Sequence, residues 1–264
     1  MSGEGVVGVI AAMPEEIAPL RRSLAGSRRV HDRPEIVTGS LAGVPIALCI
    51  SGDGARQARD GALALLSTAN VARLIVIGVA GALSPELQLF ELVVATRVVS
   101  ERGDSLQPSA AAVERALGLL GARAAVAISS EAIADSASTK VRLRIASGAG
   151  AVAAVVDLES ASYARVAEDA GIPWLVVRAV SDTATEELPL LLNRSRDVGG
   201  AVRRGRVLRE ILTDPRTLPT LLRLRTRVSR CSIGLARAVR ALSAGERTTS
   251  VGTADLGALH STRT

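Results

Sequence analysis

Short, strongly apolar runs alternate along the chain with longer segments in which apolar residues recur every three or four positions. The apolar runs predict strands at Val6–Ala11, Pro45–Ser51, Leu74–Val79, Leu92–Val99, Ala124–Ile128, Ala153–Leu158 and Trp174–Val180. The periodic segments predict helices at Glu15–Ala25, Ala55–Ala69, Ala110–Leu120, Thr139–Ser147 and Ser160–Ala170. Strands that are apolar on both faces and separated by helices are typical of a parallel sheet covered on both sides. We therefore expect an α/β fold around a mostly parallel sheet.

The pattern changes near Asp197–Gly200, beyond which arginines are frequent and acidic residues are few. Apolar residues near helical spacing predict a helix over Leu218–Leu242. They are Leu218, Leu222, Val228, Cys231, Leu235, Val239 and Leu242. We expect a main domain over residues 1–195, an arginine-rich helical extension over 196–243 packed on or beside it, and a disordered tail over 244–264.

The core must be aliphatic, because 48% of the 264 residues are hydrophobic while Phe90, Tyr163 and Trp174 are the only aromatic ones. The formal net charge of +6 is carried almost wholly by arginine, and Lys140 is the only lysine. GC-rich coding is the simplest explanation of this joint enrichment in arginine and alanine. So few aromatic rings leave no stacking platform for single-stranded nucleic acid, and no recognition motif accompanies the arginines. We expect no nucleic-acid partner.

The metal-binding residue types are sparse. Cys49, Cys231, His31 and His260 are too few and too far apart for a metal cluster or a disulfide framework, so neither a metal nor a cofactor is expected. The apolar run Val6–Ala12 lacks the basic start of a signal peptide, and no apolar run reaches the roughly 18 residues of a membrane span. The expected location is the cytoplasm.

Polar residues that follow the predicted strands are the first candidates for chemistry, because ligands of open α/β sheets bind beyond the carboxyl ends of the strands. Met13–Glu16 follows the first strand, Ser51–Gly54 the second and Gly78–Ala82 the third. The proline and acids of the first segment also suit a helix start. The glycines of the other two suit tight turns as well as close approach of the backbone to a ligand. Neither glycine segment matches a phosphate-loop or dinucleotide motif.

Two further strands end in acidic residues, within Asp157-Leu158-Glu159-Ser160-Ala161 and Arg178-Ala179-Val180-Ser181-Asp182. Capping of the next helix is the alternative explanation for these side chains. Together with Glu16 they would form a cluster of carboxylates with perturbed pKa values. Such a cluster fits general acid–base work on a glycosidic bond.

Five motifs, read in order, resemble those of the nucleoside phosphorylase and nucleosidase superfamily. They are Gly8–Glu16, Ser51–Gly54, Gly78–Ala82, Asp157–Ala161 and Arg178–Asp182. The resemblance extends from about Val6 to Asp182, and its nearest branches are the methylthioadenosine/S-adenosylhomocysteine nucleosidases and the hopanoid-associated phosphorylases. It implies a three-layer phosphorylase-like fold around a twisted, mixed, mostly parallel sheet, with residues 1–195 as the catalytic domain. The arginine-rich extension resembles those of hopanoid-type and related bacterial branches.

The resemblance also implies roles for individual residues. Glu16 matches the glutamate that activates water, Glu159 the one that binds the ribose hydroxyls, and Asp182 the acid that protonates the purine at N7. Arg178 matches an arginine that helps to position the water. The remaining expected substrate contacts are Leu158, Val79, Gly81, Ser181 and, in a segment resembling the purine-binding loop, Ile133.

The chain also departs from the family at three places. Val79 replaces the serine that phosphorylases use to bind phosphate, and the glycine-aspartate-proline-arginine phosphate motif is absent after Val6–Ala11. Water is therefore favoured over phosphate as the nucleophile, although Arg178 or another arginine could supply an anion site. Ile133 replaces a phenylalanine that stacks on the base, a contact worth about 1 to 3 kcal/mol.

We expect an enzyme that releases the base from an adenosyl-type purine nucleoside by hydrolysis, in nucleoside catabolism or methionine salvage. The alternatives are a phosphate-dependent phosphorylase acting on an adenosyl-hopanoid-like substrate and a non-catalytic nucleoside-binding member of the fold. The resemblance implies a homodimer or larger assembly. The basic helix over Leu218–Leu242 leaves open a peripheral contact with the inner face of the membrane, although a helix packed on the core with a solvated basic face is the simpler reading.

Overall fold

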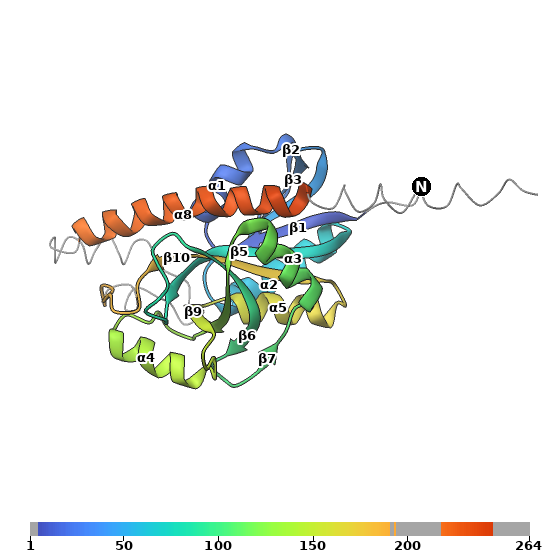
Figure 1. Ribbon diagram of the computed structural model, residues 1–264. Helices are drawn as coiled ribbons and strands as arrows, with labels where there is room; N and C mark the ends of the chain where they lie inside the picture. The colour runs from blue at the N-terminus through green and yellow to red at the C-terminus, as the bar shows by residue number, and fades with distance from the viewer. Residues whose placement is uncertain (1–4, 191–192, 194–217, 245–264) are drawn as a thin grey trace, which may run out of the picture.

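The computed structural model describes residues 5–190, 193 and 218–244 (Figure 1). Its helices are α1 (Pro14–Arg22), α2 (Ala55–Thr68), α3 (Ala110–Leu120), α4 (Ala137–Ala146), α5 (Ser160–Asp169) and α8 (Leu218–Ala244). Its strands are β1 (Val6–Ala11), β2 (Ala25–His31), β3 (Glu35–Leu41), β4 (Val44–Ile50), β5 (Val71–Ala82), β6 (Leu92–Ser100), β7 (Ser105–Leu106), β8 (Arg123–Ser129), β9 (Ala153–Asp157) and β10 (Trp174–Asp182). The predicted α/β class is confirmed.

The ten strands form one mixed sheet, in which nine follow the order β10-β6-β8-β9-β5-β1-β4-β3-β2 and β7 pairs with β6. Because β10 also pairs with β5, the strands β5, β10, β6, β8 and β9 close into a ring. Pairing is parallel from β4 through β1 and β5 to β10, and again along β6, β8 and β9. The carboxyl ends of β1, β4, β5 and β10 therefore meet at one edge, where a ligand site is expected.

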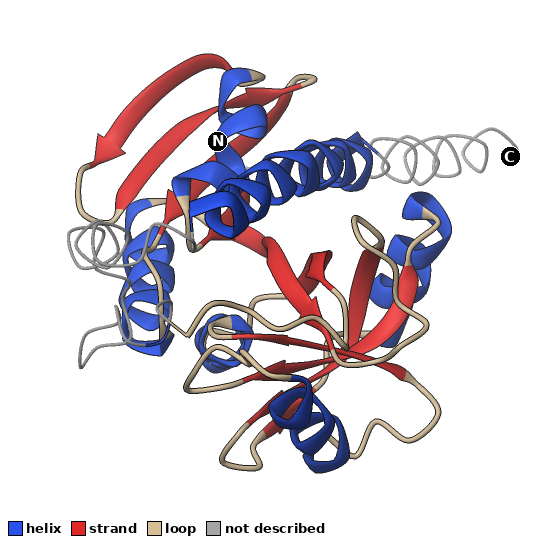
Figure 2. Ribbon diagram, turned by 90° about the vertical axis from the view of Figure 1, so that its left-hand side faces the viewer, coloured by secondary structure: helices blue, strands red, loops and turns tan. Residues whose placement is uncertain are grey.

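Alternate residues of the central strands point to opposite faces of the sheet, as a two-residue period requires. On β5, Leu74 and Val76 join the core under α2 and α5, whereas Ile75 and Ile77 join the core under α1, α3 and α8. Figure 2 shows α8 crossing the molecule beside the sheet. The helices thus cover both faces, which explains why the strands read as continuous apolar runs.

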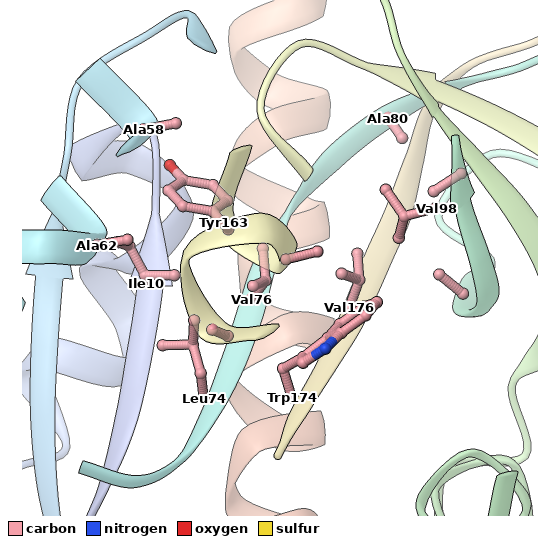
Figure 3. Close-up of a cluster of buried hydrophobic side chains, with 14 of the residues drawn as sticks. Ile10, Ala58, Ala62, Leu74, Val76, Ala80, Val98, Tyr163, Trp174 and Val176 are labelled. Carbon is pink, nitrogen blue, oxygen red and sulfur yellow. The ribbon is translucent and has the colours of Figure 1, made fainter. Parts of the chain in front are cut away.

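Two of the three aromatic residues lie in this aliphatic core (Figure 3). Tyr163 of α5 is completely buried, and Trp174 at the start of β10 is 4% exposed. Each polar atom is satisfied: the Tyr163 hydroxyl lies 2.5 Å from the Ser51 Oγ, and the Trp174 indole N–H donates to Glu168 at 2.9 Å. Buried aromatic hydroxyls and indoles usually find such partners.

Three features of the chain differ from the sequence prediction. The hairpin of β2 and β3 and the short strand β7 were not predicted, and Ala25 begins β2 rather than ending the first helix. The predicted third strand is too short, because β5 continues to Ala82. The Gly78–Ala82 segment is thus part of a strand, and the interpretation of its glycines as residues of a turn is wrong.

The predicted C-terminal helix forms α8, which packs along α1 (Figure 1) and extends to Ala244. Cys231, Leu235, Val239 and Leu242 are buried against the core, as the spacing predicts. Leu222 is 52% exposed, so its place in the apolar stripe is wrong. The predicted boundary between residues 195 and 196 and almost all of the predicted tail lie outside the described residues.

Candidate active site

A pocket of about 740 Å³ opens at the carboxyl ends of β1, β4, β5, β9 and β10. The three carboxylates singled out in the sequence, Glu16, Glu159 and Asp182, all line it. They come from the start of α1, the segment after β9 and the last residue of β10. Each side chain is less than 10% exposed, so the three carboxylates are largely shielded from bulk water.

The Glu16 carboxylate bridges two backbone segments. Its Oε1 accepts from the Val79 N–H at 2.8 Å, and its Oε2 accepts from the Met13 N–H at 2.9 Å. Met13 precedes α1, so the second bond also closes the first turn of that helix. Burial raises the pKa of Glu16, and the nearby charge of Arg178 works in the opposite direction. A carboxylate with a raised pKa is suited to accept a proton near neutral pH.

Glu159 lies opposite, where its Oε1 accepts from the Gly54 N–H at 2.8 Å. Gly54 has a φ of 92°, a backbone conformation that L side chains rarely adopt, which explains the glycine in Ser51–Gly54. Burial, followed by the neighbouring charge of Asp157, raises the pKa of Glu159 to about 8. Glu159 is therefore mainly protonated at pH 7.

Arg178 lies beneath the pocket and is 1% exposed. Its Nε is 2.9 Å from the Asp157 Oδ2, and its guanidinium donates to the Ser160 Oγ. Burial opposes the charge of Arg178, but Asp157 and the pocket glutamates outweigh it and raise the pKa of the guanidinium. Asp157 in turn accepts from the Ser129 hydroxyl and the Glu159 and Ser160 N–H groups. Arg178 is thus a fixed cation, and its partner Asp157 also holds the backbone N–H of Glu159.

Asp182 is held by the only lysine of the chain. The Lys140 Nζ donates to the Asp182 Oδ2 at 2.5 Å, and the Ser181 hydroxyl donates to the Asp182 Oδ1 at 2.7 Å. Lys140 and Asp182 are both almost completely buried, and they come from α4 and β10. An ion pair in such a place is stable only where further hydrogen bonds complete it.

Two glycines of β5 make room for these side chains. A Cβ at Gly78 would collide with the Arg178 Nη1 and lie 2.8 Å from the Glu16 Oε1. A Cβ at Gly81 would lie 2.8 Å from the Asp182 Oδ2. All three contacts are shorter than real Cβ atoms show, so glycine is required at both positions, where functional candidates approach the strand closely.

The remaining predicted contact residues surround the same space. Val79, Gly81, Ile133, Leu158 and Ser181 all line the pocket, whereas Arg178 is not among its lining residues. Leu158 also borders a second hollow of about 900 Å³, which contains none of the three carboxylates. Asn193 holds the segment around Ile133 in place. The Ile133 N–H donates to the Asn193 Oδ1, and the Asn193 Nδ2 donates to the Ile133 C=O, both at 2.9 Å.

Several residues that line the pocket were missed in the sequence. The turn between β2 and β3 contributes Asp32–Glu35, and α8 contributes Leu221, Leu224 and Val228. The hairpin has a weak strand pattern because β2 is mostly exposed. The α8 residues lie in the predicted helix, but no sequence signal indicates that its first turns reach the strand ends.

Two structural results bear on the other sequence predictions. Across the described ranges, no group of three or more metal-ligating side chains has the geometry of a metal site. In the same ranges, every helix is too short or too polar to cross a membrane.

The fold of the chain is similar to that of several solved nucleosidases. A methylthioadenosine/S-adenosylhomocysteine nucleosidase from Colwellia psychrerythraea 34H, in complex with adenine, has a TM-score of 0.73 and 17% identity over 92% of this chain and 96% of its own. The Neisseria meningitidis nucleosidase, in complex with methylthio-immucillin-A, has a TM-score of 0.70 and 19% identity over 90% and 98%. Futalosine hydrolase of Helicobacter pylori strain 26695 has a TM-score of 0.69 and 18% identity over 90% and 97%.

At the level of sequence, residues 6–213 match the family model described as the phosphorylase superfamily. This range contains all five motifs and all of the predicted site residues. The family indicated by the motifs is confirmed: the chain belongs to the phosphorylase superfamily and is a nucleoside-cleaving enzyme of that family.

Proposed function

We propose that this protein hydrolyses the N-ribosidic bond of an adenosyl-type purine nucleoside and releases the free base. The observation that carries the proposal is the convergence of Glu16, Glu159 and Asp182 on one pocket at the strand ends. Breaking this bond leaves positive charge on the sugar and negative charge on the departing base. Buried carboxylates can give a proton to the base and accept one from water, and so serve both ends of the reaction.

The reaction assigns opposite tasks to Glu16 and Asp182. The bond between C1′ and the base nitrogen breaks, and its electron pair leaves with the base. Asp182 takes up a proton from solvent and passes it to N7 of the base, while a water oxygen forms the new bond to C1′ and passes a proton to Glu16. The two backbone N–H donors on Glu16 fix its orientation for this transfer. General acid assistance of this kind is worth about 100- to 10,000-fold in rate.

Glu159 is proposed to bind the ribose hydroxyls. Because burial raises its pKa to about 8, the protonated group can both donate and accept hydrogen bonds. A cationic sugar in the transition state favours the ionised form of the same group, which then stabilises that charge. Glu159 must therefore give its proton to solvent water as the substrate binds, before its ionised form can stabilise the sugar.

Charge around the pocket favours water over phosphate. Eight acidic residues line it: Glu15, Glu16, Asp32, Glu35, Asp53, Asp157, Glu159 and Asp182. Among its lining residues within the described ranges the only basic one is Arg33, while Arg178 is engaged by Asp157 and Ser160. A phosphate dianion would be repelled by those of these carboxylates that are ionised and not paired with a cation. Val79 likewise offers only an apolar side chain where a hydroxyl would be needed.

The substituent at the 5′ carbon is proposed to contact α8. Leu221, Leu224 and Val228 form an apolar wall, to which Leu188 adds. An apolar 5′ group, such as a thioether, is better matched to this wall than a charged one. The absence of an aromatic ring at Ile133 leaves the base without a stacking partner from that residue, so apolar contacts at the 5′ end gain importance for affinity.

The test is release of base from an adenosyl panel that includes methylthioadenosine, S-adenosylhomocysteine, 5′-deoxyadenosine and an adenosyl-hopanoid. Asp182→Asn and Glu16→Gln are expected to lower kcat at least 100-fold while unfolding as wild type does. Glu114→Gln, on the exposed side of α3, is the matched control and keeps full activity. Full activity in Asp182→Asn would remove its assigned role. Tight nucleoside binding without turnover by wild type would favour a non-catalytic member of the fold.

Homodimer formation and peripheral membrane contact stay predictions, and light scattering measures the first directly. Deletion of α8 is a poor test of the second, because it would remove Cys231 and Leu235 from the core. Reversal of the exposed arginines Arg223, Arg237 and Arg240 to glutamate leaves the buried face intact. Unchanged co-sedimentation with anionic vesicles in that variant would eliminate membrane contact through this face.

A further inference from the structure

Lys140 is the only lysine among 32 basic residues of the chain, and it is also one of its most deeply buried side chains. It belongs to the first turns of α4, which follows the segment of Ile133, and it reaches across to the end of β10. Nothing in its own helix requires a lysine there. The reason for a lysine at this position must therefore lie in the contacts of its ammonium group.

The Lys140 ammonium has three donors and three acceptors. Its Nζ donates to the Asp182 Oδ2 at 2.5 Å, to the Thr183 C=O at 2.7 Å and to the Glu186 C=O at 3.0 Å. A neutral amine has only two N–H donors and would leave one of these buried acceptors without a partner. The site is therefore built for a charged ammonium group beside the carboxyl of Asp182.

Three of the described residues hold the Asp182 carboxyl in place. Lys140 holds Oδ2, the Ser181 hydroxyl holds Oδ1, and the Cα of Gly81 lies so close that a Cβ would be 2.8 Å from Oδ2. The Ser181 hydroxyl has a second acceptor in the Ala80 C=O at 3.3 Å, so it can release Oδ1. Oδ1 is thus the oxygen that the Lys140 ammonium leaves free.

We propose that Lys140 is a positioning residue for the general acid: it orients Asp182 and stabilises the carboxylate that remains when the base takes its proton. The inference rests on the proposed function. In the step concerned, the O–H bond at Oδ1 breaks, N7 of the base gains the proton, and the negative charge left on Asp182 faces the ammonium of Lys140. Lys140 itself neither gains nor loses a proton and does not touch the substrate.

A purely structural role makes a different prediction. Lys140 also ties down the turn at Thr183–Glu186, which Arg227 holds from α8 through the Glu186 carboxylate at 2.7 Å. If this anchoring were its whole contribution, removing the lysine would impair every substrate alike. If it acts through Asp182, only substrates whose base needs a proton are affected.

The experiment compares two leaving groups in the same variants. One substrate is the best nucleoside of the adenosyl panel. The other has a leaving group that needs no proton, and it is either the N7-methyl derivative of that nucleoside or a 4-nitrophenyl riboside, whichever wild type cleaves faster. In Lys140→Met we expect kcat on the ordinary nucleoside to fall at least tenfold more than kcat on the second substrate, with KM little changed. Asp182→Asn is expected to give the same selective loss, and Lys140→Arg, which keeps the charge, to recover much of the difference.

Equal losses on both substrates in Lys140→Met would overturn the inference and leave Lys140 with an anchoring role only. Wild-type protein that cleaves no nucleoside would instead overturn the proposed function. Folding of each variant is checked by thermal unfolding. If Lys140→Met does not fold, Lys140→Gln is measured in its place, and the same tenfold selectivity decides.

Discussion

The three pocket carboxylates are chemically alike, but their neighbours differentiate them. Glu16 accepts from two backbone N–H groups, Glu159 from one, and Asp182 pairs with the ammonium of Lys140. Burial raises the pKa of both glutamates. Residue identity was readable from the motifs, whereas these protonation preferences depend on burial and on partners from distant parts of the chain.

Glu159 is expected to make the stability of the protein depend on pH. Its pKa rises from 4.5 to about 8 on folding, so the folded protein holds a proton that the unfolded chain releases between these values. The free energy of unfolding therefore falls as pH rises through this range, by up to about 1.4 kcal/mol per pKa unit. Glu159→Gln cannot lose a proton here, so its free energy of unfolding should not show this fall. The melting temperatures of variant and wild type should agree at pH 4, and the variant should melt at a higher temperature than wild type at pH 9.

Glu114→Gln, an exposed change, is the control and should follow the wild-type curve. A Glu159→Gln variant that is less stable than wild type at pH 9 would contradict the assignment of a protonated, buried Glu159.

Gly78 and Gly118 give a matched pair of glycine-to-alanine changes. A Cβ at Gly78 collides with Arg178 and Glu16, while a Cβ at Gly118 meets nothing within 4 Å on the surface of α3. We expect Gly78→Ala to destabilise by about 1 to 3 kcal/mol and to abolish base release. Gly118→Ala should stabilise by up to about 1 kcal/mol, because alanine is the better helix former. Urea unfolding measures both, and equal stabilities would contradict the packing described.

At the scale of elements, α8 has two functions along its length. Its C-terminal half supplies Leu235 and Val239 to the core, while its N-terminal half presents Leu221 and Leu224 to the pocket. The periodicity predicted the helix and most of its buried face. It did not predict contact with the pocket, because that depends on how the helix crosses the sheet rather than on its own pattern.

Substitutions at Leu224 and Leu222 test the contact between α8 and the pocket. Leu224 lines the pocket, whereas Leu222 is 52% exposed two residues away. Leu224→Ala is expected to raise KM for methylthioadenosine about tenfold or more while changing KM for adenosine much less, since loss of apolar contact in a pocket is worth about 1 to 3 kcal/mol. Leu222→Ala should change neither value. Equal effects of Leu224→Ala on both substrates would place the 5′ group elsewhere.

At the scale of the whole molecule, the sequence predicted the α/β class, the family and the elements that carry the five motifs. The prediction failed where local pattern and tertiary structure diverge. The β2–β3 hairpin was missed because most residues of β2 are exposed and give no apolar pattern. The length of β5 was underestimated because the strand continues through glycines, which ordinarily weaken strands. The lone Lys140 could be seen in the sequence, but its partner lies 42 residues away on another element.

The central claim is that water, not phosphate, attacks the sugar in this acidic pocket. The most direct test is incubation of purified wild-type protein with methylthioadenosine, with and without inorganic phosphate, followed by identification of the base and the sugar. We predict adenine and a free reducing sugar at the same rate in both conditions. Turnover that requires phosphate and yields a sugar 1-phosphate would contradict the account.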